Sequence, residues 1–128
     1  MEPRRTILLV DDNQMHRYAL SKHLEESGFT VVCAESGAQA FEAIAAHLPD
    51  AILLDINLPD TTGFEICKQL KTDAKTQKIP VIFHSATHDT ATARSDAFDL
   101  GAASFLSYPI HIEHLVSVLW GAMAHAGK

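Results

Sequence analysis

Residues 7–12 read ILLVDD, an aliphatic run that ends in two carboxylates. A second run of the same kind, AILLD, covers residues 51–55. Neither run alternates apolar and polar side chains, so both are predicted to be strands buried on two faces, as in parallel sheets. We therefore expect a parallel sheet with an acidic group directly after two of its strands.

The whole chain alternates between short apolar runs and longer amphipathic stretches. Strands are predicted at Thr6–Val10, Thr30–Ala34, Ala51–Leu54, Ile79–Phe83 and Ser104–Ser107. Helices are predicted at Asn13–Ser27, Ser36–His47, Gly63–Thr72, Thr90–Leu100 and Glu113–Ala124. Gly28 and Gly101 are expected to end the first and fourth helices. Because crossovers are right-handed, this order predicts an α/β fold, a (βα)5 doubly wound parallel five-stranded sheet.

Length and composition limit the function classes. The chain has 128 residues, which favours one domain, and its net charge of −6 and lack of a basic patch argue against direct nucleic-acid binding. No apolar run approaches the ~20 residues that a membrane helix needs. The two cysteines, Cys33 and Cys67, indicate a reducing, cytoplasmic setting and are expected to be buried thiols. Trp120 and Met123 are expected in the core.

Polar side chains follow the predicted strands, where doubly wound sheets bind their ligands. Asp11 and Asp12 come after the first strand, Asp55 after the third and Ser85 after the fourth. Three carboxylates at one sheet edge repel each other, and Mg²⁺ would neutralise that repulsion. Asp55 could then act as a nucleophile that forms an aspartyl phosphate, with Ser85 donating to a phosphoryl oxygen. Helix capping and turn formation remain the alternative roles for these acids.

Four motifs resemble those of the receiver domain of two-component response regulators. They are residues 7–13, residues 53–59 with Gly63 downstream, residues 79–82 leading to Ser85-Ala86, and residues 101–106 leading to Pro109. The motifs occur in the family's order, each at a predicted strand end, and the resemblance covers about residues 5–124. It implies a single receiver domain over residues 1–128, with the flavodoxin-like strand order 2-1-3-4-5.

The resemblance implies a role for each matched position. Asp55 would be the phosphoacceptor, and Ser85 would be the switch hydroxyl. Mg²⁺ would be held by Asp11, Asp12, Asp55 and the backbone carbonyl of Asn57, with Asp12 as the more direct ligand. Phe105 occupies the aromatic switch position, and the Tyr108–Pro109 bond is expected to be cis.

One position departs from the family pattern. The family has a Lys directly before the Pro that follows the last strand, and this chain has Tyr108. Ser107 and His111 are the closest polar neighbours in the sequence, and neither is an evident substitute. We hypothesise that Mg²⁺ still binds, that the Tyr108 hydroxyl supplies a neutral hydrogen bond, and that coupling to the output face is altered.

The histidines carry no zinc signature. The chain has eight of them, and a surface or packing role is expected for His88, His111 and His114. His84, beside Ser85, is the exception, because its charge could tune the switch near neutral pH.

These observations predict a receiver that takes a phosphoryl group on Asp55 from a histidine kinase or phosphotransfer protein, with Mg²⁺. It would signal through protein contacts to a downstream target or a fused effector domain, and it would not be a conventional enzyme. If it pairs with itself, the face formed by the fourth helix, fifth strand and fifth helix is the expected surface. The alternative is a degenerate receiver that docks partners without phosphorylation. An aspartyl-intermediate phosphatase is disfavoured by the adjacent Asp11-Asp12 pair, and a flavin carrier by carboxylates after the first strand.

Overall fold

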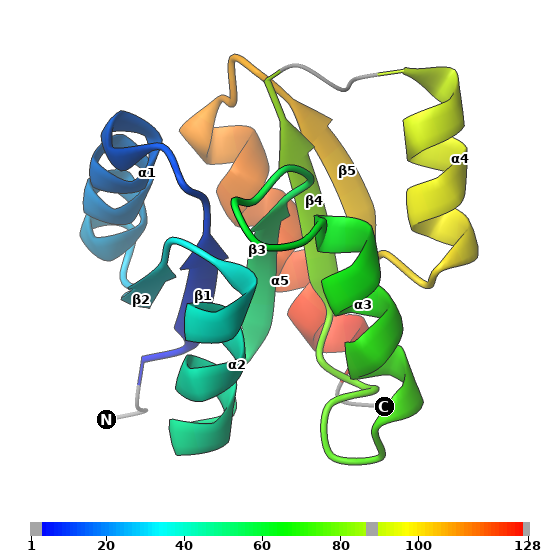
Figure 1. Ribbon diagram of the computed structural model, residues 1–128. Helices are drawn as coiled ribbons and strands as arrows, with labels where there is room; N and C mark the ends of the chain where they lie inside the picture. The colour runs from blue at the N-terminus through cyan, green and yellow to red at the C-terminus, as the bar shows by residue number, and fades with distance from the viewer. Residues whose placement is uncertain (1–3, 87–89, 127–128) are drawn as a thin grey trace.

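The computed structural model describes residues 4–86 and 90–126. Five parallel strands form one sheet in the order β2-β1-β3-β4-β5, which confirms the predicted fold class and strand order (Figure 1). The strands are β1 (Thr6–Val10), β2 (Thr30–Ala34), β3 (Ala51–Asp55), β4 (Val81–Ser85) and β5 (Ser104–Ser107). The helices are α1 (Gln14–Glu26), α2 (Gly37–Ala46), α3 (Gly63–Thr72), α4 (Ala91–Asp99) and α5 (Ile112–Ala126).

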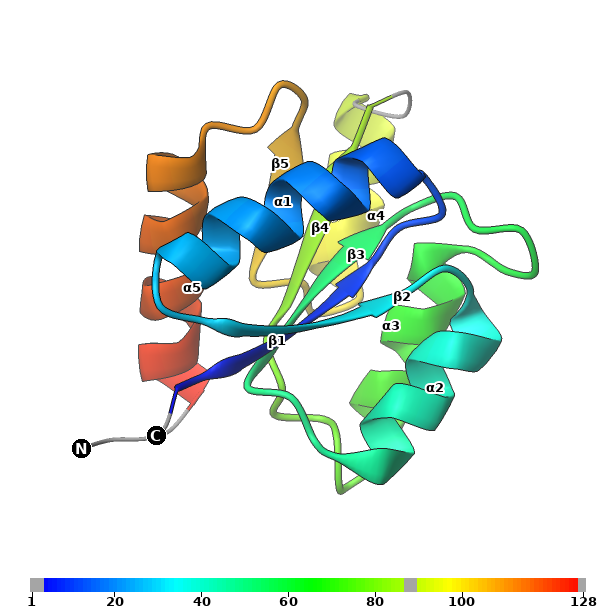
Figure 2. The same cartoon turned by 90° about the vertical axis from the view of Figure 1, so that its left-hand side faces the viewer.

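The helices cover both faces of the sheet, because alternate strand residues point to opposite sides. Leu9 packs in one buried cluster with Leu24 of α1 and Leu119 of α5. Its neighbour Val10 packs in a second cluster that includes residues of α2, α3 and α4, such as Ile66. Figure 2 shows α1 and α5 on one side of the strands and α2 and α3 on the other. Each buried leucine contributes roughly 2 kcal/mol to this three-layer arrangement.

Helix ends follow the local sequence signals. The first turns of four helices are capped by side-chain oxygens of Asn13, Ser36, Thr62 and Thr90. The glycines that follow α1 and α4 have left-handed backbones, with φ of 100° at Gly28 and 95° at Gly101. Because a side chain disfavours this conformation, these two glycines confirm the predicted helix ends.

The prediction for the fourth strand is wrong by two residues, since β4 is Val81–Ser85 rather than Ile79–Phe83. Pro80 has no N–H to donate to a ladder, although its carbonyl accepts from the Ile52 amide at 3.0 Å. As a result, His84 and Ser85 lie inside β4 rather than after it, and both are buried.

Two core predictions also need correction. Cys33 is exposed rather than buried, because β2 is an edge strand, whereas Cys67 is buried as expected. Trp120 is 47% exposed and rests one side of its ring on Phe29, with ring centroids 5.2 Å apart. Met123, one turn later on α5, is buried as predicted.

Candidate functional site

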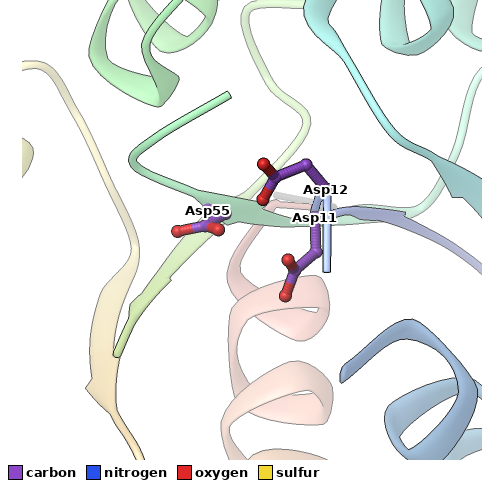
Figure 3. A group of neighbouring side chains, drawn as sticks. All are labelled: Asp11, Asp12 and Asp55. Carbon is purple, nitrogen blue, oxygen red and sulfur yellow. The ribbon is translucent and has the colours of Figure 1, made fainter. Parts of the chain in front are cut away.

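Two neighbouring strands bring three carboxylates to one point of the sheet edge. Asp11 and Asp12 follow β1, and Asp55 ends β3, which pairs with β1 in parallel. The three side chains, shown in Figure 3, each place a carboxylate oxygen within 4.8 Å of the others. Asp12 and Asp55 line a cleft of about 260 Å³, together with His16 and Asn57, while Asp11 is buried behind it. The structure therefore brings together the three carboxylates that the sequence singled out.

Asp11 is fully buried and surrounded by donors. Its Oδ1 accepts from the Asn13 amide at 2.8 Å. Its Oδ2 lies 3.2 Å from His16 Nδ1 and accepts from the Tyr108 hydroxyl at 3.4 Å. Since a carboxylate only accepts hydrogen bonds, His16 donates here when Nδ1 carries the proton. Hydrogen bonds of this kind make burial of the Asp11 carboxylate tolerable.

Asp55 lies in a different environment. Burial and the nearby Asp11 charge raise the pKa of Asp55 from 3.8 to about 7, although the backbone amides of Ile56 and Asn57 oppose the shift. At neutral pH the site therefore needs a counter-charge if Asp55 is to be an anion. Carboxylate and carbonyl oxygens are the ligands that a hard divalent cation such as Mg²⁺ prefers. The three acids and the Asn57 carbonyl, as a donor set, fit that ion.

The loop after β3 is held by hydrogen bonds to its own backbone and to the start of α2. The Gly63 amide donates to the Ile56 carbonyl at 2.7 Å, and Asn57 pairs with Thr62 in an isolated bridge. A Cβ at Gly63 would overlap the carbonyl oxygen of Asp55, so only glycine allows this close approach. Asp60 accepts from the first two amides of α2, which lowers the pKa of its carboxyl.

Ser85 ends β4, and Phe105 lies on the neighbouring β5. Ser85 is buried at the end of β4, and its carbonyl accepts from the Tyr108 amide at 3.3 Å. Phe105 is also buried, with the Arg94 guanidinium 4.8 Å from its ring centroid. Arg94 further donates to the Phe105 carbonyl at 3.3 Å and to Ser107 Oγ at 3.4 Å. These contacts hold α4 against β5 with the aromatic ring turned inward.

Tyr108, the position at which the sequence is expected to depart from the receiver pattern, lies next to Asp11. The Tyr108–Pro109 bond is cis, as expected. The ring stacks on His16, with centroids 4.4 Å apart and planes 23° apart, and the hydroxyl bonds to Asp11. Sequence reasoning missed His16, because it searched the neighbours of Tyr108 along the chain. The available signal was that His16, three residues after the Asn13 cap, lies in the first turn of α1 and hence near the strand ends.

His84 does not behave as hypothesised. Its side chain is completely buried, and burial lowers its pKa to about 4, which outweighs the opposing effect of Asp11. The ring lies edge-on to Tyr108, and neither ring nitrogen has a hydrogen-bond partner among the described residues. His84 is therefore neutral near pH 7, and the idea that it titrates there is wrong. His111 and His114 are exposed, and His88 lies outside the described residues.

Comparison with known proteins identifies this arrangement. The family model for the response regulator receiver domain matches residues 7–119. The chain belongs to the response regulator receiver family. The response regulator MprA of Mycobacterium ulcerans is 35% identical over 111 residues, which cover 87% of this chain and 47% of that protein. The chain thus spans about half the length of the curated relatives it matches.

Solved receiver structures superpose closely. A putative response regulator from Chloroflexus aurantiacus has a TM-score of 0.90 at 30% identity, covering 95% of this chain and 99% of that one. The chemotaxis response regulator CheY4 of Vibrio cholerae has a TM-score of 0.85 at 26% identity, covering 94% of this chain and 99% of that one. The chain is thus a receiver domain of a two-component system. Among the helices of the described ranges, none has the length and apolarity to cross a bilayer.

Proposed function

We propose that this receiver accepts one phosphoryl group on Asp55 in a Mg²⁺-dependent reaction. The observation that carries the proposal is the cluster of three carboxylates at the sheet edge, in which burial and the Asp11 charge raise the pKa of Asp55 to about 7. A nucleophilic carboxylate must be ionised, and a bound cation would favour the ionised form of Asp55 at neutral pH. Asp11, Asp12, Asp55 and the Asn57 carbonyl would hold Mg²⁺, which supplies charge neutralisation for the transferred group.

The chain's own residues would then carry out the transfer. An Asp55 oxygen attacks phosphorus, and an O–P bond forms as the bond from phosphorus to the donor breaks, with its electron pair leaving on the donor atom. Ser85, at the end of β4, would donate its hydroxyl to a phosphoryl oxygen. Phe105 would follow Ser85 as the aromatic switch, which requires the ring to leave the contact with Arg94 described above.

The partners follow from this chemistry. A histidine kinase or phosphotransfer protein would supply the phosphoryl group, and a downstream protein or a fused effector domain would receive the signal. We propose that residues 1–128 act as one receiver domain in the cytoplasm, and that the chain catalyses only its own modification. Self-pairing, if it occurs, would use the face formed by α4, β5 and α5.

Intact-mass spectrometry after incubation with acetyl phosphate and Mg²⁺ tests the proposal. The wild type is expected to gain one phosphoryl group, and EDTA is expected to prevent the gain. Asp55→Asn should gain none, whereas Asp99→Asn, which changes an exposed acid on α4, should match the wild type. A gain that persists in Asp55→Asn would place the modification elsewhere and refute the assignment.

A second candidate function is a docking module that works without phosphorylation. The observation that favours it is that the Tyr108 hydroxyl bonds to Asp11 rather than to the proposed acceptor. If calorimetry shows Mg²⁺ binding but acetyl phosphate adds no mass, this second function is supported and phosphoryl acceptance is rejected.

A further inference from the structure

Among the described residues, the Tyr108 hydroxyl bonds to Asp11 and not to Asp55, the proposed phosphoacceptor. Tyr108 lies in the loop between β5 and α5, next to the acidic cluster. In the described part of the chain its hydroxyl bonds to Asp11 Oδ2 at 3.4 Å, and no bond to Asp55 is present. The loop is therefore connected to the first strand, not to the third.

The ring of Tyr108 is held from two sides. It stacks on His16 of α1 with centroids 4.4 Å apart, and its backbone amide donates to the Ser85 carbonyl at 3.3 Å. His84 packs edge-on beneath it, with centroids 5.7 Å apart. Because α1 and β4 both hold Tyr108, the hydroxyl cannot turn to Asp55 unless these contacts change.

Oδ2 is the more crowded oxygen of Asp11, and His84 Nδ1 also lies 3.9 Å from it. Oδ1 accepts from the Asn13 amide, and Oδ2 faces both His16 and Tyr108. A cation that draws on Oδ2 must therefore weaken or displace one of these contacts. The Tyr108 contact, at 3.4 Å against 3.2 Å for His16, is the longer of the two, so it is the one expected to give way.

We propose that Tyr108 is a positioning residue for Asp11, through which the β5–α5 loop responds to divalent-cation binding rather than to phosphorylation of Asp55. The proposal rests on the function proposed above, since it needs Mg²⁺ at the acidic cluster. Its consequence is that a metal-loaded, unphosphorylated chain would already present an altered β5–α5 loop to partners.

Tyrosine NMR tests this directly, because the chain has two tyrosines. Tyr18 is 69% exposed on α1 and serves as the internal control for ¹³C-labelled tyrosine rings. The Tyr108 ring signal is expected to shift as MgCl₂ is added, in step with metal binding, while the Tyr18 signal stays in place. Phosphorylation with acetyl phosphate should then add a smaller shift. A Tyr108 signal that moves only at the phosphorylation step would overturn the proposal.

Calorimetric Mg²⁺ affinity supplies a second readout, which a merely structural role would not alter. Tyr108→Phe keeps the stacked ring and removes the hydroxyl, so one competitor for Oδ2 is lost. We expect Mg²⁺ to bind about two- to tenfold tighter, the range of one neutral hydrogen bond. Tyr18→Phe should leave the affinity unchanged. Equal or weaker binding by Tyr108→Phe would contradict the proposal.

Failure of the inference and failure of the proposed function can be told apart. If the Asn57 amide shifts with MgCl₂ and Asp55 gains mass, the proposed function stands, whatever Tyr108 does. If MgCl₂ moves neither Asn57 nor Tyr108, both ideas fail together. Should Tyr108→Phe not fold, the wild-type titration still decides the question.

Discussion

Asp11 follows β1 and Asp55 ends the neighbouring β3, yet their surroundings differ. Asp11 is fully buried and faces the Asn13 amide, His16 and the Tyr108 hydroxyl. Asp55 is partly exposed, its pKa is raised to about 7, and backbone amides are its donors among the residues that the structure describes.

This difference shows where the chain places its side-chain donors. Both α1 and the β5–α5 loop direct theirs to the carboxylate beside the acceptor. The acceptor itself depends on backbone geometry and on a counter-charge from solution. Three experiments test this difference between Asp11 and Asp55.

Gly63→Ala should disrupt the Asp55 region through the backbone. The new Cβ would overlap the Asp55 carbonyl oxygen and would lie 3.0 Å from Phe83 Cε1. We expect a loss of about 3 kcal/mol in the free energy of unfolding, the upper range for overpacking, and weaker Mg²⁺ binding. Urea denaturation and calorimetry measure the two effects.

Gly121→Ala is the matched control, because nothing lies within 4 Å of a Cβ at this exposed position of α5. It should stabilise the chain by about 0.5–1 kcal/mol, since alanine favours a helix over glycine. Equal stability of the two variants would show that the loop after β3 can move aside, and that backbone geometry does not position Asp55.

The stability of the metal-free chain should depend on pH through Asp55. The pKa of Asp55 is 3.8 in the unfolded chain and about 7 in the folded chain. Between these pH values the folded chain therefore binds one more proton than the unfolded chain. The free energy of unfolding therefore falls as pH rises from about 4 to about 7, and levels off above. After allowance for solvent screening, we expect Asp55 to contribute a fall of about 2 kcal/mol.

Denaturation in EDTA at pH 5 and pH 8 measures this dependence, and the difference from Asp55→Asn isolates the contribution of Asp55. The variant should lose less stability than the wild type over the same interval, and Mg²⁺ should offset the wild-type loss at pH 8. Parallel pH profiles for wild type and variant would mean that the acceptor carboxyl is not held at a raised pKa.

Tyr108→Lys should weaken Mg²⁺ binding at the carboxylates, and this is the smallest of the three expected effects. An ammonium group at the β5–α5 loop would compete with Mg²⁺ for the same three negative charges. We expect Mg²⁺ affinity to fall about tenfold by calorimetry, or about 1.4 kcal/mol. Tighter Mg²⁺ binding by the variant would contradict this expectation. It would show that the ammonium group does not compete with the metal and that the tyrosine itself limits Mg²⁺ affinity.

The sequence predicted most of the fold and the place of the site. Unbroken aliphatic runs mark the buried strands, and because parallel strands end at one edge, Asp11 and Asp55 had to meet. The start of β4 was predicted two residues too early, because Ile79 and Pro80 extend the apolar run but lie outside the strand. The His16–Tyr108 stack could not be read from spacing, because it depends on how α1 leans toward a loop 92 positions further along the chain.

The half-exposed Trp120 has a practical consequence for spectroscopy. It is the only tryptophan of the chain, and it rests on Phe29, the residue just before β2, at the end of the sheet away from the carboxylates. Indole emission will thus report the loss of packing between α5 and Phe29, while the ring of Tyr108 reports the opposite end of the sheet. A gap between melting curves recorded from these two reporters would reveal that the acidic end opens before the molecule unfolds as a whole.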